Sequence, residues 1–417
     1  NGEGAERACG SLRCVCSHKR KIRGTWTDME RLIDRYEKKL IEQGLAEKNQ
    51  LLMAEIETEM VWNRDDPKCD ILADVIRNLN ISSLCFSPPA EPYRTLVDFL
   101  SSRADTITLK DNETRLFLHD LPVIREFSAE KIVAQLKRRK AVIVDGHGIV
   151  TYGTVSPEQT FVVYSSVLFS CFVKFFADFL EHSLEGTVTD EEMTAFKRVM
   201  ENLPPSPQID MTFKKAPFTS ESEVYDAVSE VGKPVVNYGF VDSVMGNISY
   251  LHNDILYISQ TGSFLDELEG FIDPCPVDNS SCTGITASSE LPAHMLIVTD
   301  SPKRAILHGH PKFSVIMSLV CDKKDCEFDG QCHVNCPDPR YVRDIPIVSG
   351  ETGTGPNALC NTVPKALKDH RGAIVYGHGV FTAGQDDFNE PFHNLIDIEK
   401  MCRTEYFEKL KKAGIEV

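Results

Sequence analysis

Residues 286–311 read TASSELPAHMLIVTDSPKRAILHGHP and combine a carboxylate with a closely spaced pair of histidines. In an extended strand, side chains two positions apart point to the same face, so His308 and His310 can offer two imidazoles to one ion. A third imidazole from His378 would give a three-histidine set with an open coordination position, which is typical of catalytic zinc sites and also suits other divalent ions. Taken alone, a His-x-His pair more often consists of two half-exposed strand histidines. Glu290 precedes this pair by 18 residues, and the sequence therefore indicates a metal site with a carboxylate beside it.

Length and charge restrict the class of protein. The chain has 417 residues, of which 42% are hydrophobic; it is too long for one core and predicts two or three domains of a soluble globular protein. Its formal net charge of −17 argues against nucleic acid as the main partner and favours a well-solvated surface in the cytoplasm. The 14 uncharged residues of Thr160–Val173 are too few to span a bilayer, so we expect a buried core helix and no membrane partner.

Three sequence anchors recur with offsets of 223, 224 and 231 residues, which indicates two copies of one fold. The paired anchors are Ser83–Pro88 with Ile306–Pro311, Leu118–Val123 with Val342–Ile347, and Val144–Gly148 with Val375–Gly379. The first copy has Cys85 and Ser87 where the second has His308 and His310, and its remaining histidine, His147, cannot assemble the same site. We therefore assign the chemistry to the second copy and interpret the first as degenerate, with a structural or regulatory role.

These observations divide the chain into four segments. Residues 1–24 form a basic, cysteine-containing tail without the apolar segment of a secretory signal, and the missing initiator Met indicates processing or truncation. Residues 25–200 form the degenerate domain, residues 201–220 form a proline-rich linker with little periodicity, and residues 221–417 form the metal-dependent domain.

Local patterns predict the secondary structure of the first copy. Thr27 and Glu30 form a capping box ahead of apolar residues at helical spacing, so we expect a helix from Thr27 to about Gly44. The other predicted elements are helices at 51–62, 70–79, 92–101 and 129–140, a charged hairpin at 105–115, strands at 83–86 and 141–144, and a long helix from Pro157.

The 14 cysteines include groups whose spacing is unusual. One group lies in a polar stretch, where four thiolates suit a structural zinc ion or an iron–sulfur cluster; it consists of Cys321, Cys326, Cys332 and Cys336. The spacing is not a standard one, so disulfides and free thiols are equally open. The same question applies to Cys9, Cys14 and Cys16 with His18, and to Cys275 with Cys282. Ordinary buried thiols are expected at Cys85, Cys171, Cys360 and Cys402.

Five ordered motifs resemble the class II aldolase/adducin family, typified by fuculose-phosphate aldolase. They are Gly246-Asn247-Ile248-Ser249, Gln260-Thr261-Gly262, Ser288-Ser289-Glu290, His308-Gly309-His310-Pro311 and Gly377-His378-Gly379-Val380. The resemblance covers about Glu221 to the C-terminus, with a weaker copy over about Thr25–Leu184. It implies an α/β fold made of two α/β/α domains with mainly antiparallel central sheets, the N-terminal one degenerate. It also implies a homo-oligomer, either a dimer or a tetramer.

The resemblance assigns roles to individual residues. His308, His310 and His378 would bind one divalent metal, with Zn favoured over Fe, Mn or Co. Glu290 would be the acid/base, and a metal ligand when substrate is absent. A substrate phosphate would be bound by Gly246, Asn247, Thr261, Gly262, Ser288 and Ser289. These types are suited to phosphate, because glycine N–H groups and small hydroxyls allow close approach of several donors, although a simple turn and a hairpin would explain the two glycine motifs separately.

The expected function is that of a metal-dependent lyase acting on a small phosphorylated sugar or hydroxy-carbonyl compound. A divalent ion lowers the cost of an enediolate, and a nearby carboxylate can move the proton. The alternatives are an epimerase, decarboxylase, dehydratase or iron-dependent oxygenase of the same family, or a non-catalytic, adducin-like scaffold. Family aldolases use a tyrosine as a proton donor; Tyr341 could take this role here, but a packed or surface tyrosine is the favoured interpretation. His294, four residues after Glu290, is expected to be supporting or structural.

Overall fold

The computed structural model describes residues 14–16, 27–281, 283–323, 326–328, 331–351 and 355–416. The chain forms two compact units. The first contains Asn1–Arg94, Ser101–Ile107 and Asp120–Val167, and the second contains Thr95–Leu100, Thr108–His119 and Leu168–Val417. Two short pieces from the first half of the chain therefore belong to the second unit. The sequence boundaries at 25–200 and 221–417 concern the two copies and stay a prediction, and most of the predicted tail, with Cys9 and His18, lies outside the described residues.

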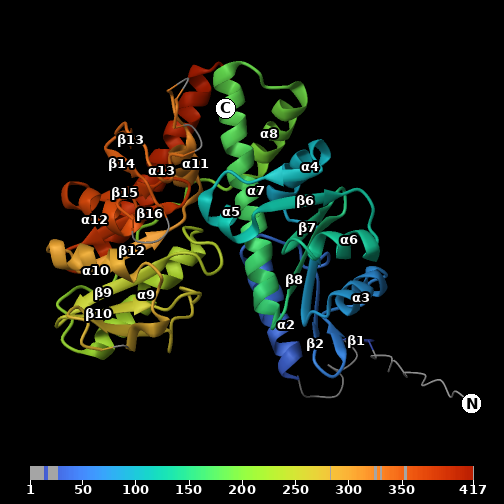
Figure 1. Ribbon diagram of the computed structural model, residues 1–417, viewed down its shortest axis with the longest axis horizontal. Helices are drawn as coiled ribbons and strands as arrows, with labels where there is room; N and C mark the ends of the chain where they lie inside the picture. Colours follow the sequence, from blue (N-terminus) through green and yellow to red (C-terminus); the bar gives the residue numbers. More distant parts are fainter. Residues whose placement is uncertain are drawn as a thin grey trace, which may run out of the picture. The chain divides into compact units, whose positions relative to one another are not determined.

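Eight strands form the first sheet in the order β1-β3-β2-β4-β8-β7-β6-β5 (Figure 1). They are β1 (Cys14–Cys16), β2 (Leu52–Ile56), β3 (Met60–Trp62), β4 (Ser83–Ser87), β5 (Thr106–Thr108), β6 (Asp120–Ile124), β7 (Ala141–Val144) and β8 (Gly148–Gly153). The β1–β3 and β6–β7 pairs are parallel, and the other described pairs are antiparallel. The sheet contacts helices α2 (Asp28–Glu42), α3 (Lys68–Leu79) and α6 (Ala129–Leu136). Helix α4 (Tyr93–Arg103) follows β4 in the chain.

The predicted start of α2 is confirmed. The backbone N–H of Glu30 donates to Oγ1 of Thr27 at 3.2 Å, and the Thr27 N–H donates to Oε2 of Glu30 at 2.8 Å. Both bonds satisfy N–H groups that have no partner inside the helix, as a capping box requires. The helix ends just before Gly44, which has a φ of +67°.

Two predicted elements of the first half are wrong. The expected helix at 51–62 is the antiparallel pair β2 and β3. Seven of the eight strand residues are buried, so buried and exposed positions do not alternate, and such an apolar run also fits a helix at the sequence level. The expected hairpin at 105–115 is strand β5 followed by helix α5 (Asn112–Leu118). Asp111 begins this helix by accepting the N–H of Thr114 at 2.7 Å.

The second sheet has the order β11-β10-β9-β12-β16-β15-β14-β13 (Figure 1). Its strands are β9 (Asn247–His252), β10 (Ile255–Ser259), β11 (Ile272–Pro276), β12 (Ala305–Gly309), β13 (Arg340–Val342), β14 (Ile345–Val348), β15 (Gly372–Val375) and β16 (Gly379–Gly384). The helices that follow α7 (Pro157–Glu185) are α8 (Asp190–Asn202), α9 (Glu221–Asn237), the 3-10 helix η2 (Thr283–Thr286), α10 (Leu291–Asp300), α11 (Lys312–Leu319), α12 (Leu359–Asp369) and α13 (Asn389–Lys412). Only the β14–β15 pair is parallel among the described pairs of this sheet.

Strand β16 shows how helices cover both faces of this sheet. Phe381 and Ala383 belong to a core with side chains of α10 and α12. Thr382, between them, donates from its hydroxyl to the carbonyl of Pro391 in α13 at 2.8 Å. Because successive side chains of a strand point to opposite faces, α13 lies on the face away from α10 and α12. The expected α/β architecture with mainly antiparallel sheets is confirmed.

The three sequence anchors occupy equivalent sheet positions. The first links β4 with β12, the second β6 with β14, and the third the β7–β8 turn with the β15–β16 turn. Seven of the eight strands of one sheet thus have a counterpart at the same place in the other. The edge strands differ, because β1 precedes β2 in the chain and pairs with β3 in parallel, whereas β11 follows β10 and pairs with it antiparallel. This agreement supports the interpretation of two copies, the first degenerate, which we keep as an inference.

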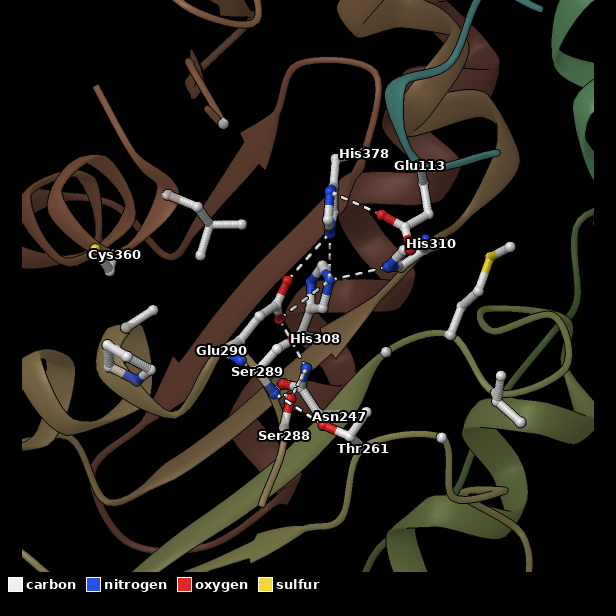
Figure 2. A pocket seen from close by; sticks show the side chains of 18 of the residues that line it. Glu113, Asn247, Thr261, Ser288, Ser289, Glu290, His308, His310, Cys360 and His378 are labelled. Atoms are coloured by element: carbon white, nitrogen blue, oxygen red, sulfur yellow. Dashed lines mark hydrogen bonds and ion pairs between the residues drawn. The ribbon is translucent and has the colours of Figure 1, made fainter. Parts of the chain in front are cut away.

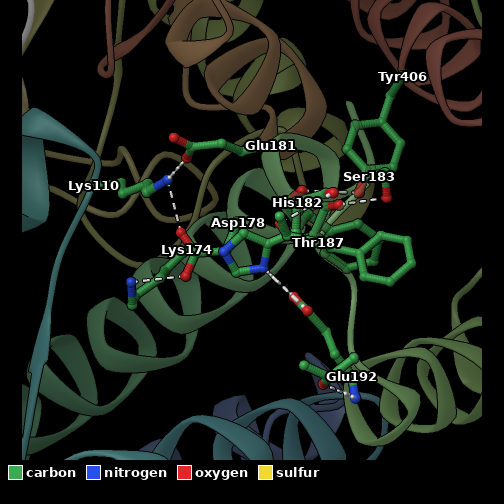
Figure 3. A network of polar contacts seen from close by, with 12 residues as sticks. Lys110, Lys174, Asp178, Glu181, His182, Ser183, Thr187, Glu192 and Tyr406 are labelled. Atoms are coloured by element: carbon green, nitrogen blue, oxygen red, sulfur yellow. Dashed lines mark hydrogen bonds and ion pairs between the residues drawn. The ribbon is translucent and has the colours of Figure 1, made fainter. Parts of the chain in front are cut away.

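Helix α7 (Pro157–Glu185) is long and apolar enough to cross a membrane by length and composition alone. However, 89% of its most apolar 18-residue window is buried in the structure, so the predicted core helix is confirmed. Its carboxyl-terminal part contributes to the second unit, where the hydroxyl of Tyr406 donates to the Phe176 carbonyl at 2.9 Å (Figure 3). Asp178, on the same part of α7, pairs with Lys110 at 2.7 Å (Figure 3).

The segment predicted as a linker contains no helix or strand between α8 and α9. This segment belongs to the second unit and is bonded there to residues near the start of α13. The Phe213 N–H donates to Oδ1 of Asn389 at 2.8 Å, and the Ala216 N–H donates to Oδ2 of Asp387 at 3.3 Å. These bonds fix part of the segment next to the start of α13.

Candidate metal centre

Strand β12 carries His308 in the middle of the second sheet, between β9 and β16. The side chain is buried, and its ring stacks on Phe381 with centroids 3.9 Å apart. His310 follows the strand, and its N–H donates to the Phe240 carbonyl at 2.7 Å. A Cβ on the intervening Gly309 would lie 2.8 Å from the same Phe240 oxygen, which is why glycine is needed between the two histidines.

The turn between β15 and β16 carries the third histidine, and Figure 2 shows the three rings converging. Gly377 has a φ of +59°, a conformation that favours glycine, and His378 follows it. The Nε2 atoms of His310 and His378 lie 2.9 and 3.2 Å from Nε2 of His308. Two nitrogens bound to one tetrahedral zinc ion lie about 3.4 Å apart. Among the described residues these histidines are the only group of this kind, with ligand atoms within 4.8 Å of one another, and the donor set fits a divalent ion.

Glu290 lies directly beside this group, just before α10. Its Oε1 lies 3.1 Å from Nε2 of His378, and its Oε2 lies 3.5 Å from Nε2 of His308. Asn247 Nδ2 donates to Oε2 at 2.7 Å and orients the carboxylate. This position suits either a fourth metal ligand or a proton carrier.

Burial and charge oppose each other within the centre. Burial lowers the pKa of His308 to about 4 and holds the pKa of His310 well below its usual range. Burial also disfavours a charged His378, but the carboxylates of Glu290 and Glu113 outweigh it and raise the pKa of His378 to about 9. For Glu290 itself, burial disfavours the carboxylate, but His308 and His378 outweigh this and hold its pKa below the usual range. Two imidazoles are therefore neutral at pH 7, the form that binds metal.

The outer ring nitrogens have different surroundings. Nδ1 of His308 donates to the Val380 carbonyl at 3.0 Å, which leaves the Nε2 lone pair facing the centre. Nδ1 of His378 faces Oε2 of Glu113 at 3.4 Å (Figure 2). Nδ1 of His310 is buried without a hydrogen-bond partner in the described part of the chain. Sequence reasoning missed Glu113, which fell inside the expected hairpin.

A cavity of about 430 Å³ adjoins the histidines. Its lining includes all six residues predicted to bind phosphate, namely Gly246, Asn247, Thr261, Gly262, Ser288 and Ser289. Asn247 Nδ2 donates to the Ser288 hydroxyl at 3.0 Å, and the Ser289 N–H donates to the Thr261 hydroxyl at 3.1 Å. The described lining contains neither Lys nor Arg, so N–H groups and hydroxyls are the donors available to an anion.

Two other predicted residues lie away from the cavity. His294 is buried, and its Nδ1 lies 2.7 Å from the Ser249 hydroxyl, an arrangement that agrees with a structural role. Tyr341 is 52% exposed, and its ring lies 6.0 Å from that of His370. Because Tyr341 does not line the cavity, the structure does not bring it to the centre as a proton donor.

The cysteine group of the polar stretch consists of free thiols at Cys321, Cys326, Cys332 and Cys336. Burial raises the pKa of Cys332, and the other three thiols and Arg340 also influence it. A second metal or disulfides at these positions stay a prediction. Cys275 is a buried free thiol, and Cys282 lies outside the described residues.

The corresponding positions of the first sheet are unlike the metal centre. Cys85 and Ser87 are buried in β4, and burial raises the pKa of the Cys85 thiol. His147 is exposed in the β7–β8 turn, with its ring 5.5 Å from that of Phe127. No group of three metal-binding side chains occurs in the described part of this sheet.

Comparison with known proteins identifies the domain. Residues 226–406 match the family described as Class II Aldolase and Adducin N-terminal domain. These residues form a class II aldolase/adducin domain. The structure also resembles an L-fuculose-1-phosphate aldolase from Thermus thermophilus, at 20% identity over 47% of this chain and 100% of that one, with a TM-score of 0.39.

Two further solved structures are similar to part of this chain. One is YgbL from Klebsiella pneumoniae, a putative aldolase/epimerase/decarboxylase, at 18% identity over 47% of this chain and 99% of that one, with a TM-score of 0.36. The other is a sugar-phosphate aldolase from Thermotoga maritima, at 17% identity over 47% of this chain and 98% of that one, with a TM-score of 0.34. No curated protein matches the chain.

Proposed function

We propose that the class II aldolase/adducin domain is a metal-dependent lyase that makes or breaks a carbon–carbon bond in a small phosphorylated sugar or hydroxy-carbonyl compound. The observation that carries this proposal is the convergence of three histidine Nε2 atoms beside the carboxylate of Glu290, whose side chain is 13% exposed, at one side of a cavity lined by hydroxyl and N–H groups. A scaffold protein has no need for such a buried polar group, whose desolvation costs free energy.

His308, His310 and His378 would hold the divalent ion, with Zn favoured because three imidazoles with an open coordination position are typical of catalytic zinc sites. When bound, the ion would supply a Lewis acid that stabilises negative charge on the oxygens of an enediolate. Glu290 would carry the proton, since its carboxylate is ionised and is held by Asn247.

The phosphate would bind where Thr261, Ser288 and Ser289 line the cavity. The Ser289 N–H, which donates to the Thr261 hydroxyl, and this hydroxyl, which donates to the Ala287 carbonyl, would exchange these bonds for bonds to the phosphate. Because the described lining has no cationic side chain, several weak donors would share the charge of the phosphate. This arrangement anchors the end of the substrate away from the reacting carbon. We also propose a cytoplasmic homo-oligomer, either a dimer or a tetramer.

Purified full-length protein tests the proposal. We expect one divalent ion per chain, cleavage of at least one of the fuculose-, rhamnulose- or ribulose-type phosphates, and a rate at least about 100-fold lower in Glu290→Gln, because a positioned acid/base contributes 10²–10⁴-fold. His378→Ala should lose the ion, whereas His147→Ala, in the equivalent turn of the first sheet, should retain it. Absence of metal from the wild-type protein, or equal cleavage by Glu290→Gln, would contradict the proposal.

A further inference from the structure

The first half of the chain supplies part of the surroundings of the metal centre. The segment Thr108–His119 runs from the last residue of β5 to the residue before β6 and belongs to the second unit. Within it, the Asn112 N–H donates to the Gly377 carbonyl at 2.7 Å, and Asn112 Nδ2 donates to the Tyr376 carbonyl at 2.9 Å. Both bonds hold α5 against the turn that carries His378.

The fit between α5 and this turn is close. A Cβ on Gly377 would lie 3.2 Å from the backbone nitrogen of Asn112, a tighter contact than most real Cβ atoms make. The next residue, Glu113, points its carboxylate at the ring of His378, with Oε2 3.4 Å from Nδ1 (Figure 2). Glu113 therefore lies on the side of the ring opposite to the Nε2 atom that faces the centre.

Other contacts fix the start of α5. Asp111 is fully buried and accepts both the N–H of Thr114, at 2.7 Å, and its hydroxyl, at 2.6 Å. Lys110, just before it, pairs with Asp178 at 2.7 Å and with Glu181 at 2.6 Å on α7 (Figure 3). Residues on both sides of the start of α5 are thus bonded within the second unit. These bonds hold the first turn of the helix, which carries Glu113, in place.

Helix α5 has no counterpart in the second half of the chain. The equivalent strands of the second sheet, β13 and β14, are joined by only Arg343 and Asp344. The first sheet has residues 109–119 at this connection. The carboxylate of Glu113 is therefore not a remnant of a second metal site, because the intact copy has no helix there.

The outer nitrogens of the other two histidines show what Glu113 adds. Nδ1 of His308 donates to a backbone carbonyl, and Nδ1 of His310 has no hydrogen-bond partner among the described residues. In the part of the chain that the structure describes, Glu113 supplies the one carboxylate paired with an outer ring nitrogen of the centre. A carboxylate at this place fixes the tautomer and orientation of a ligand histidine and raises its basicity.

We propose that Glu113 is a positioning residue of the metal centre, which accepts the Nδ1–H of His378 and thereby directs the Nε2 lone pair of this histidine to the ion. The proposal rests on the proposed function, since it requires a bound divalent ion. It gives the first half of the chain a direct role in the site, although that half lacks the histidines.

Zinc affinity of the full chain, measured by competition with a chromogenic chelator, tests this role. Glu113→Ala should bind zinc 10–100-fold more weakly than the wild type, roughly the loss found for partners of ligand histidines. Glu113→Gln keeps an acceptor oxygen without the charge and should lose less. Leu116→Ala is the matched control, because Leu116 lies on the same helix with a 60% exposed side chain.

A spectroscopic measurement separates positioning from general support of the fold. In the zinc-bound wild type, the ring ¹⁵N shifts of His378 should show a protonated Nδ1 and a metal-bound Nε2, and Glu113→Ala should change the Nδ1 signal. Unchanged shifts and a zinc affinity within twofold of wild type in both Glu113 variants would overturn the proposal while leaving the proposed function intact. If the wild type bound no zinc, the proposed function would fail first. Should Glu113→Ala not fold, the isosteric Glu113→Gln decides by the same two measurements.

Discussion

Strands β4 and β12 occupy the same position in two sheets whose strand orders agree except at one edge strand, but only β12 leads into a cluster of metal-binding side chains among the described residues. Cys85 and Ser87 fill the positions of His308 and His310, and all four side chains are buried. The sheet position therefore requires a buried residue and leaves its chemistry open. The difference between the sheets comes from what neighbouring elements bring to the position.

Those neighbouring elements differ in kind. Beside β12, the loop before α10 brings Glu290 and the β15–β16 turn brings the third histidine. Beside β4, the equivalent turn leaves His147 exposed to solvent. Burying imidazoles and a carboxylate costs desolvation free energy, which binding to a shared ion can offset. A single buried histidine in the turn of the first sheet would have no such ion to offset its desolvation.

Exchanging the paired residues gives the largest expected effect. His308→Ala with His310→Ala should remove the ion completely, because one histidine and one carboxylate remain. Cys85→His with Ser87→His should add no second ion, since the exposed third histidine does not reach them, and the larger side chains should destabilise the protein by about 1–3 kcal/mol. Elemental analysis counts the ions per chain. Two ions in the second variant would show that strand residues alone decide the site.

The predicted site residues that line the cavity came from the resemblance of five ordered motifs to a known family, since a turn or a hairpin would explain each glycine motif by itself. The sequence could not predict Glu113, whose partner His378 lies in the other half of the chain, since hydrophobic spacing does not say which distant turn a short helix contacts. The error at 51–62 has a different cause. Because residues on both faces of β2 and β3 are buried, apolar and polar residues do not alternate along these strands. By contrast, the capping box at Thr27 involves neighbours only, and it was predicted correctly.

The helices after the two strands offer a smaller contrast. Helix α4 has no side-chain hydrogen bond at its N-cap, whereas Glu399 of α13 accepts the N–H groups of Phe313 and Ser314 in α11 at 2.9 and 2.8 Å. Glu399→Ala should leave these donors unpaired and lower the free energy of unfolding by about 1–3 kcal/mol. Glu399→Gln, which keeps an acceptor, should lose less. Urea unfolding of the metal-free protein measures both, and equal midpoints for wild type and Glu399→Ala would show that the cap is not needed.

The last contrast concerns the protonation of the histidines in the two turns, where the expected change is about tenfold in zinc affinity for each pH unit. In the metal-free protein the pKa of His378 is raised to about 9, against burial, by Glu290 and Glu113, so this histidine carries a proton at neutral pH. A protonated Nε2 cannot bind an ion, and zinc must displace that proton. Apparent zinc affinity should therefore rise roughly tenfold per pH unit up to about pH 9 and then level off, since one proton is exchanged for one ion.

Calorimetry in buffers of different ionisation enthalpy measures this exchange directly. At about pH 7.5, zinc binding should release about one proton per ion, and the number should fall towards zero above about pH 9. His147→Ala should release the same number, because the turn of the first sheet does not contribute to the centre. A zinc affinity that does not change between about pH 6 and 8 would show that His378 is already neutral in this range. Glu290 and Glu113 would then not raise the pKa of His378, and the two carboxylates would not be what sets its turn apart from that of His147.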